Sequence, residues 1–267
     1  MPDLKRILIT GGTSGLGGEL VKNFHRRGFH VVTTGRREAP DFGFSERFSY
    51  YRVDFSNLEM TASVFLEIAA LHQFDIVINN AGILSPPDYT VTRNGHEYTF
   101  QVNFLAHMLA DIILLKAIPA EKPLIMASIT SPVYKLAKID INTKRQYNAM
   151  QAYSDSKLYQ AILCPYLSDS FKGMNLTCCS FNPGVFGSGI YRMRGPVFRL
   201  LYRIAAPFMR SPERVAGVLS DILTGKEIEP GVIYNIRKVT SKIPQPDPAV
   251  SDNFWSECHK FIEPYIT

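Results

Sequence analysis

Short apolar runs alternate with longer amphipathic segments along most of the chain, and this alternation is the feature that most constrains its fold. The apolar runs, which favour strands, occupy residues 7–9, 30–34, 48–53, 75–79, 123–127, 175–181 and 232–236. The segments that favour helices are residues 15–28, 58–72, 97–117 and 153–172. Strands that are apolar almost throughout indicate a parallel sheet buried on both faces, and intervening helices indicate right-handed crossovers. The pattern predicts an α/β fold, a doubly wound parallel sheet of about seven strands with helices on both faces.

The composition fits one globular domain. The chain has 267 residues, of which 46% are hydrophobic, and neither a repeat nor a linker-like stretch divides it. A chain of this length buries a large apolar core on folding, so neither a disulfide nor a metal is needed to hold it together. We therefore expect residues 1–267 to form a single domain without a metal site.

Charge and cysteine content exclude several classes of protein. The 29 basic and 24 acidic residues give a net charge of +5, and the absence of any run of five like charges argues against a nucleic-acid partner. The four cysteines, Cys164, Cys178, Cys179 and Cys258, form no C-x-x-C pair, which favours reduced thiols and a cytoplasmic location. No segment approaches about 18 uninterrupted apolar residues, so we expect neither a signal peptide nor a transmembrane helix.

A glycine-rich loop joins the first expected strand to the first expected helix. Its sequence, Thr10-Gly-Gly-Thr-Ser-Gly-Leu-Gly17, follows the pattern G-x-x-x-G-x-G. Glycines let the backbone turn tightly and approach a pyrophosphate, while the helix N-terminus offers N–H donors and the positive end of a dipole. The loop therefore predicts a Rossmann-type dinucleotide site rather than a turn without a ligand. Its predicted contacts come from Gly11, Thr13, Ser14, Gly15, Leu16 and Gly17.

The residues after the second expected strand select the cofactor. An NAD site usually has a carboxylate there that holds the ribose 2′-hydroxyl, but this chain places Arg36 and Arg37 before its first carboxylate, Glu38. A guanidinium can pair with the 2′-phosphate of NADP. The sequence therefore favours NADP(H) over NAD(H), although a solvated pair of surface arginines would give the same pattern.

A tyrosine and a lysine stand four residues apart in Tyr153-Ser-Asp-Ser-Lys157, and this spacing places them on one face of a helix. A phenol with a pKa near 10 is a poor acid or base at neutral pH, and lowering that pKa by about three units requires roughly 4 kcal/mol of preference for the phenolate. One ammonium at about 4 Å supplies about that much at an effective dielectric constant near 20. The pair can therefore serve in acid–base catalysis, although the spacing alone is common on surface helices.

Four motifs in this order carry a resemblance to a known family. The glycine loop is followed by Asn79-Asn-Ala-Gly82 at the end of the fourth expected strand, by Ser128 after the fifth, and by Y-x-x-x-K at Tyr153 and Lys157. Over about residues 5 to 240 the chain resembles the classical short-chain dehydrogenase/reductase family. The long gap between Ser128 and Tyr153, and residues 152–158, are similar to its retinol-dehydrogenase-like branch.

The resemblance implies the catalytic residues. Tyr153 would exchange the proton with the substrate, and Lys157 would lower the pKa of this tyrosine and hold the nicotinamide ribose. Ser128 would hydrogen-bond the substrate oxygen, and motif register favours it over the hydroxyls at positions 130 and 131. Asn103 would anchor a water of the proton relay through an irregularity in the helix at 97–117. His107, one turn further on, is interpreted as a structural residue, either in the packing or on the helix surface.

The resemblance also extends the cofactor site. Asp54 and Phe55 match a pair that contacts the adenine, and residues 80–82 match the stretch beside the adenosine ribose. Residues 183–188 match a motif that contacts the nicotinamide amide, with a serine in place of its threonine. The further residues implied in cofactor binding are Asp54, Phe55, Asn80, Ala81, Gly82, Pro183, Gly184, Val185 and Ser188.

The segment after Ser188 corresponds to the substrate loop of this family. Residues 188–212 alternate apolar and aromatic side chains with arginines. This pattern fits a lid helix that packs on the domain, a lid over a large lipophilic substrate, or a segment that rests on a membrane surface. We expect a bulky, apolar carbonyl or alcohol as the substrate.

These observations predict an NADP(H)-dependent oxidoreductase that moves a hydride between nicotinamide and a carbonyl or alcohol carbon. Two other classes stay open: a catalytically idle NADP-binding regulator, and a nicotinamide enzyme with a non-redox outcome such as an epimerase or dehydratase. The family commonly assembles through helices that correspond to residues 97–117 and 153–172, so a homodimer or homotetramer is consistent with the resemblance. The expected partner is a small lipophilic molecule and not a nucleic acid, and contact with a membrane surface is left open.

Overall fold

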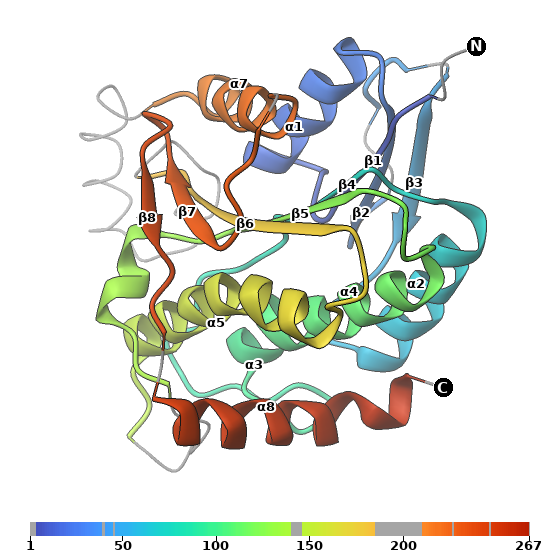
Figure 1. The fold of residues 1–267 in the computed structure, drawn as a ribbon. Coiled ribbons are helices and arrows are strands. Elements are labelled where there is room, and N and C mark those ends of the chain that lie inside the picture. Colours follow the sequence, from blue (N-terminus) through green and yellow to red (C-terminus); the bar gives the residue numbers. More distant parts are fainter. Residues whose placement is uncertain are drawn as a thin grey trace.

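The described part of the chain contains eight strands, which form one sheet in the order β3-β2-β1-β4-β5-β6-β7-β8 (Figure 1). The protein is seen in a computed structural model that describes residues 4–38, 41–44, 46–139, 146–184, 210–225, 227–245 and 247–266. Neighbours from β3 to β7 pair in parallel, and β8 pairs antiparallel with β7. The strands are β1 (Arg6–Ile9), β2 (His30–Gly35), β3 (Phe48–Arg52), β4 (Ile76–Asn79), β5 (Leu124–Ile129), β6 (Leu176–Asn182), β7 (Val232–Asn235) and β8 (Thr240–Lys242).

Helices cover both faces of this sheet and confirm the predicted doubly wound α/β fold (Figure 1). The α-helices of the described residues are α1 (Gly15–Arg26), α2 (Leu58–Leu71), α3 (Tyr98–Phe100), α4 (Ala106–Ala117), α5 (Ala149–Ser170), α7 (Pro212–Leu223) and α8 (Pro248–Ile262). A π-helical segment, η1 (Gln101–Leu105), joins α3 to α4, and two 3-10 helices are η2 (Pro132–Leu136) and η5 (Glu263–Tyr265). Helix α5 starts one turn before the predicted position because the Asn148 side chain accepts from Gln151 N and caps it.

The order of the strands fixes where a ligand can bind. The chain builds the sheet outward from β1 through β2 to β3, and then returns to place β4 on the other side of β1. In open α/β sheets, ligands bind outside the carboxyl ends of the strands at such a switch point. The segments that follow β1, β2, β4 and β5 are therefore the ones to search for a site.

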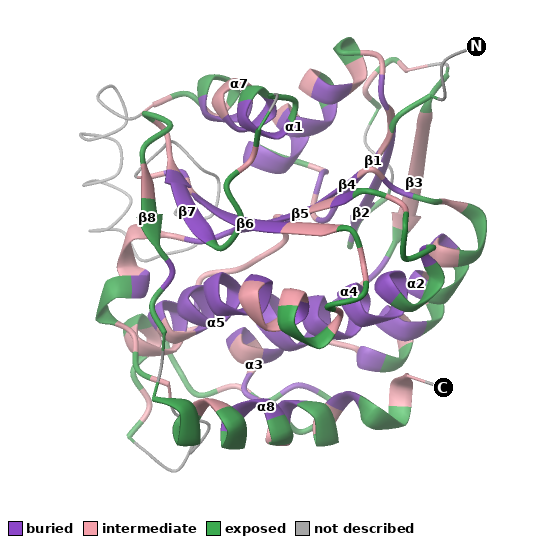
Figure 2. Cartoon of the chain, viewed as in Figure 1, coloured by how far each residue is buried: buried purple, intermediate pink, exposed green. Residues whose placement is uncertain are grey.

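Alternate side chains of the strands enter two separate cores. Leu8 and Val77 pack with α2, α4 and α5, whereas Ile7 and Ile78 pack with α1 and α7. All four are fully buried, and Figure 2 shows the central strands and the inner faces of the helices as largely buried, whereas the edge strands β3 and β8 are intermediate or exposed. This burial on both sides is why the strand segments are apolar almost throughout and carry no alternation of polar residues.

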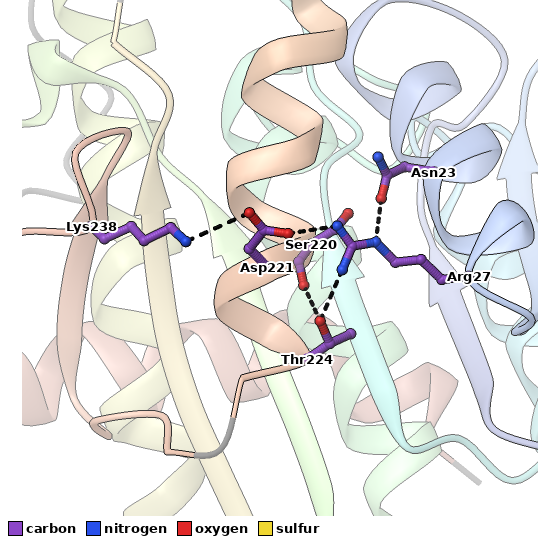
Figure 3. A network of polar contacts seen from close by, with 6 residues as sticks. All are labelled: Asn23, Arg27, Ser220, Asp221, Thr224 and Lys238. Atoms are coloured by element: carbon purple, nitrogen blue, oxygen red, sulfur yellow. Dashed lines mark hydrogen bonds and ion pairs between the residues drawn. The ribbon is translucent and has the colours of Figure 1, made fainter.

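Helix α7, which the sequence analysis did not predict, is fixed against α1 by a surface network (Figure 3). Arg27 donates from Nη2 to Asp221 Oδ1 at 2.6 Å and from Nη1 to Thr224 Oγ1 at 3.1 Å. The hydrogen bond from Arg27 is the main cause that lowers the pKa of Asp221. Lys238 Nζ lies 3.5 Å from the other Asp221 oxygen. Exposed pairs of this kind add little stability, but they orient the helix that follows residues 185–209.

The helix from Tyr98 to Ala117 is, within the described ranges, the one that length and composition would allow to cross a membrane. The mean hydropathy of its most apolar 18-residue window is 1.3, and 89% of that window is buried inside the protein. It lies between the sheet and α8, whose Phe254 and Trp255 contact Phe104 (Figure 1). Burial to this extent is typical of a central helix in a packed core.

A carboxyl group stands inside the core beside this helix. Asp111 of α4 is 1% exposed and accepts a hydrogen bond of 2.6 Å from Asn79 Nδ2 of β4. Burial raises the pKa of Asp111 well above its usual range, although the bond from Asn79 opposes the shift. Asn79 Oδ1 and Asp111 Oδ1 are both buried, and neither has a hydrogen-bond partner within the described ranges. Oxygens buried in this way reduce the stability of a fold.

The Asp111–Asn79 pair predicts a pH-dependent gain of stability in Asp111→Asn. The folded protein binds the Asp111 proton more tightly than the unfolded chain does, so this group makes the free energy of unfolding fall as pH rises above about 4. The substitution removes the titration and supplies an amide donor. We expect the free energy of unfolding to rise by about 1–2 kcal/mol at pH 7, roughly 2–8 °C in Tm, and by less at low pH. Thermal unfolding across this pH range measures the effect.

The exposed Asp169 offers the control, because its side chain is 79% exposed. Asp169→Asn should change the Tm little at any pH. If Asp111→Asn were no more stable than the wild type at neutral pH, the stated cost of the buried carboxyl group would be refuted.

Candidate active site

The glycine-rich loop lies at the switch point and is tied to the ends of β2 and β4. Gly12 N donates to Thr34 O at 3.1 Å, and Asn80 Nδ2 donates to Thr10 O at 2.9 Å. The Thr10 hydroxyl accepts from the backbone N–H groups of Asn80 and Ala81 at 2.9 and 3.0 Å. These bonds bring the predicted loop residues and the predicted stretch at 80–82 together at the carboxyl edge of the sheet.

The loop has the shape that a close backbone approach requires. Gly11 and Gly15 have φ angles of +70° and +58°, in the left-handed region that glycine adopts without strain. A Cβ built on Gly17 would lie 2.2 Å from Gly11 O. Ser14, the N-cap residue of α1, makes no side-chain capping bond, so the first N–H groups of this helix stay available to an anion.

The irregularity predicted in the long helix is the π-helical segment η1, which contains Asn103. Asn103 has no exposed surface, and its Oδ1 accepts from Ile83 N at 2.8 Å. Its Nδ2 donates to Ile83 O and to Ser156 Oγ, each at 3.0 Å. A single Asn side chain therefore holds the segment after β4 against α5. Segments of this type occur often at functional sites.

His107 connects this helix to the glycine loop inside the core. Its Nε2 lies 3.0 Å from Thr10 Oγ1, and its Nδ1 lies 3.0 Å from Asn103 O. Burial lowers the pKa of His107 to about 3, so the ring is neutral at physiological pH. Because a carbonyl oxygen only accepts, we assign the hydrogen to Nδ1, and Nε2 then accepts from Thr10. His107 is a structural residue, as the sequence analysis predicted.

Tyr153 and Lys157 lie one turn apart on α5, with Nζ 5.8 Å from the centre of the tyrosine ring. Lys157 is 4% exposed. Its Nζ donates to Ile129 O at 3.1 Å and to Gln160 Oε1 at 2.7 Å. Burial lowers the pKa of Lys157 to about 7. The ammonium therefore gains or loses its proton near neutral pH in the protein without a bound ligand.

The segment after β4, the π-helical segment and helix α5 meet at this lysine. A Cβ built on Gly82 would lie 3.5 Å from Lys157 Nζ and 3.2 Å from Asn103 Oδ1. Ser156, which Asn103 contacts, donates in turn to Tyr153 O at 2.8 Å. The structure thus brings Gly82, Asn103, Tyr153 and Lys157 into one group at the carboxyl edge.

Ser128 does not belong to this group. It is 1% exposed, and its hydroxyl lies 3.6 Å from Cys164 Sγ. Cys164 follows Tyr153 by about three turns of α5, or about 16 Å along the helix axis, and a tyrosine on a helix leans toward the helix N-terminus. A hydroxyl beside Cys164 is too far away to share a substrate oxygen with Tyr153. This geometry contradicts the prediction that Ser128 contacts the substrate.

Two other hydroxyls follow β5. Thr130 is 2% exposed and donates to Lys157 O at 2.7 Å, so its hydroxyl is committed to the helix. Ser131 is half-buried, and its hydroxyl makes no capping bond to η2. The last residue of η2 accepts from Gln151 Nε2 at 3.2 Å. The chain thus contacts α5 at Lys157, through Thr130, and at Gln151, through Leu136. Tyr153 lies between these two positions on α5. Ser131 directly follows Thr130, which makes it the best placed of the three hydroxyls.

The end of β2 is basic. Arg36 and Arg37 follow this strand and are exposed. Arg52 of β3 donates from Nε to Arg36 O at 3.2 Å, and its Nη1 lies 3.4 Å from Glu38 Oε1. Arg52 carries no local signal in the sequence, because only the pairing of β3 with β2 places it opposite Gly35. A Cβ on Gly35 would lie 2.4 Å from a side-chain atom of the glycine loop, so the basic group adjoins that loop.

The remaining predicted cofactor residues are placed in part. Asp54 Oδ1 accepts from Ser56 N and Ser56 Oγ, each at 2.9 Å, and so closes the turn after β3. The Phe55 ring is 4% exposed and meets His107 edge-on at 4.8 Å. Its side chain therefore belongs to the core, and its carbonyl accepts from Gln101 Nε2 at 3.1 Å. Pro183 is buried at the end of β6.

Gly184 and Arg210 flank a stretch that lies outside the described residues. A Cβ built on Gly184, whose φ is +69°, would lie 3.3 Å from Arg210 Nη1. The two flanking residues are therefore neighbours beside the end of β6. Val185, Ser188 and residues 189–209 of the predicted lid lie outside the described residues.

Comparison with known proteins identifies the family. A family model described as short chain dehydrogenase matches residues 5–195. Retinol dehydrogenase 12 of Mus musculus is 29% identical over 239 residues, which cover 85% of this chain and 75% of that protein. Polyprenol dehydrogenase of Danio rerio is 25% identical over 291 residues, covering 96% of this chain and 88% of that protein.

A solved structure shows the same fold. A short-chain dehydrogenase/reductase from Burkholderia multivorans with bound NADP superposes with a TM-score of 0.67 at 18% identity, covering 90% of this chain and 99% of that chain. The family match includes the glycine loop, residues 80–82 and the Tyr153–Lys157 pair. The chain therefore belongs to the short-chain dehydrogenase family, in its retinol-dehydrogenase-like branch, and is an oxidoreductase of that family.

Proposed function

We propose that this chain uses NADP(H) to interconvert a bulky apolar carbonyl compound and its alcohol, with Tyr153 as the acid–base residue. The observation that carries the proposal is the meeting of Gly82, Asn103 and Lys157 beside Tyr153, at the same edge of the sheet as the glycine loop. A cytoplasmic location, a single domain and a homo-oligomeric assembly stay predictions.

The loop and the basic group beside it support NADP(H). The loop leaves no room for a Cβ at Gly17 and ends at the N-terminus of α1, which suits a pyrophosphate. Glu38, the carboxylate nearest the end of β2, pairs with Arg52. Arg36 and Arg37 would then hold the 2′-phosphate, a group that guanidinium binds well. When bound, the nicotinamide supplies or accepts the hydride.

The residues of α5 would handle the proton. A charged Lys157 near the Tyr153 ring favours the phenolate, and the effect is larger in a buried site than in water. The low pKa of Lys157, about 7, means that this charge is present at and below neutral pH and is lost above it. Asn103 fixes the backbone around both residues through Ile83 and Ser156.

The hydroxyl that binds the substrate oxygen is assigned to Ser131 in this proposal. Ser128 and Thr130 are both buried, with hydroxyls that contact Cys164 and Lys157 O. Ser131 keeps partial exposure and lies between the end of β5 and η2, beside the turn that carries Tyr153. A donor placed there would stabilise negative charge that develops on the oxygen.

Apolar side chains at the same edge support a bulky apolar substrate. Tyr89, Leu136 and Met150 are 46%, 64% and 46% exposed. They come from the segment after β4, which also holds Gly82, from η2, whose Leu136 O accepts from Gln151, and from the first turn of α5, which precedes Tyr153. Large exposed apolar residues gathered near a site often mark where an apolar ligand binds. Two relatives carry names that specify retinol and polyprenol.

Gly17→Ala should impair cofactor binding, whereas Gly18→Ala should not. The new Cβ at 17 would lie 2.2 Å from Gly11 O and 2.5 Å from Asn80 Nδ2, so the loop must move. At Gly18 the nearest atom is at 3.6 Å, and alanine favours the helix by roughly 1 kcal/mol. We expect NADPH affinity to fall at least about tenfold in the first variant and to hold in the second. Fluorescence titration with NADPH decides, and equal affinities in both variants would refute this account of the loop.

Ser131→Ala and Ser128→Ala separate the two serine assignments. Loss of a hydrogen-bond donor to a developing oxyanion lowers kcat by about 100-fold or more, so we expect this result for Ser131→Ala. Ser128→Ala removes a hydroxyl that contacts Cys164 and should leave kcat/KM close to the wild-type value. The measurement is steady-state kinetics on one carbonyl substrate at saturating NADPH. The opposite outcome would return the role to Ser128.

The function itself is tested with a panel of carbonyls and alcohols, followed by reduced-nicotinamide absorbance with both cofactors. We expect the long or polycyclic members to react best and NADPH to be preferred. Tyr153→Phe should lower kcat by about 100-fold or more, because it removes an acid–base group, while NADPH still binds.

Other outcomes point to the alternatives. NADPH binding without turnover of any compound would favour an idle regulator, and conversion without net NADPH consumption would favour a non-redox enzyme. Equal activity on small polar ketones would contradict the apolar substrate class.

A further inference from the structure

Two acceptors hold the Lys157 ammonium within the described part of the chain. Nζ donates to the backbone carbonyl of Ile129 at 3.1 Å and to Gln160 Oε1 at 2.7 Å. The second bond is the shorter, and it is the one that depends on a side chain. Lys157 and Gln160 stand three residues apart on α5, so their side chains are neighbours on one face of the helix.

Gln160 lowers the stability of the fold at this position. It has no exposed surface, and its Nε2, which carries two N–H donors, has no hydrogen-bond partner among the residues that the structure describes. A buried amide with unpaired donors destabilises a protein. The next residues of α5, Ala161, Ile162 and Leu163, are apolar and just as buried, so an apolar side chain would suit the core better. What Gln160 adds over such a residue is an acceptor for Lys157.

The titratable groups around Nζ provide no substitute for this acceptor. On α5 itself the Tyr153 ring lies 5.8 Å away. From α4 the neutral His107 is close enough for the charge of Lys157 to help burial lower its pKa. From β5 the contact is the carbonyl of Ile129. Burial lowers the pKa of Lys157, and no carboxylate among the described residues counteracts it.

We propose that Gln160 is a positioning residue whose amide oxygen keeps Lys157 protonated and holds its Nζ beside Gly82 and Asn103. A hydrogen bond to the charged form of a group favours that form. Removing the acceptor should therefore make the ammonium easier to deprotonate, and replacing it with a carboxylate should make it harder. The effect on Lys157 stands by itself, whereas its consequence for turnover rests on the proposed function.

The test is a direct titration of Lys157 by NMR in the full chain with isotope-labelled lysine, assigned by the signal that Lys157→Arg removes. Gln160→Met keeps the length of the side chain but removes the acceptor, and should lower the pKa of Lys157 by about one unit. Gln160→Glu has the same shape with a negative charge, and should raise that pKa by about one unit or more.

Gln151→Met is the matched control. Gln151 lies on the same helix, but its Nε2 donates to Asp155 Oδ1 at 2.6 Å and to Leu136 O at 3.2 Å, and its amide oxygen is not one of the two acceptors of Lys157 given above. This variant should leave the pKa of Lys157 unchanged. The two Gln160 variants should shift the pKa of Lys157 in opposite directions, so each variant tests the proposal by itself. Thermal unfolding shows which of the two variants are folded. A Lys157 pKa that stays at the wild-type value, or that moves in the same direction in both variants, overturns the proposal.

The same variants have a second readout if the enzyme turns over as proposed. As the pH rises, kcat/KM should fall when Lys157 loses its proton. The pH at which this fall occurs should be lower in Gln160→Met and higher in Gln160→Glu. A uniform loss of activity without either shift would indicate a merely structural role. A wild type that consumes no NADPH with any carbonyl would contradict the proposed function and leave the titration result for Gln160 standing.

Discussion

One buried chain of hydrogen bonds connects the three parts from which the site is built. It runs from the Thr10 hydroxyl to His107, from His107 to the carbonyl of Asn103, and from the Asn103 side chain to Ser156. Ser156 closes the chain on the carbonyl of Tyr153. The glycine loop, the π-helical segment and the α5 turn are thus held in fixed positions by neutral groups. Because the pKa of His107 is about 3, this connection keeps its protonation state across the physiological range.

The π-helical segment explains how the central helix can carry both packing and polar contacts. All five of its residues are buried. In η1 the Asn103 carbonyl accepts from the His107 ring, and the Asn103 side chain reaches Ile83 and Ser156. The geometry of the site therefore depends on a local departure from regular helix inside a core that is otherwise apolar.

Much of this architecture could be predicted from the sequence, since apolar runs, glycine spacing and the Tyr153–Lys157 spacing act locally. What escaped prediction depends on how distant segments align. The alignment of β5 with α5 decides which hydroxyl lies near the turn that carries Tyr153, and it favours Ser131 over Ser128. The register of β3 on β2 brings Arg52 to the edge of the sheet proposed to bind the cofactor. Helices α7 and α8 had local signals, because Ser211 and Asp247 each cap a helix with proline in its first turn. Strand β8 has three polar residues and no such signal.

Several buried polar atoms without a hydrogen-bond partner among the described residues lie in the layer that holds Lys157. Asn79 Oδ1, Asp111 Oδ1 and Gln160 Nε2 all lie in the layer between the sheet and helices α4 and α5. Lys157 adds a buried ammonium to the same layer. Groups of this kind oppose folding unless they are paired. An apolar side chain at position 160 would favour the stability of this layer more than glutamine does, so we interpret Gln160 as a cost of holding a titratable amine at the site proposed for it.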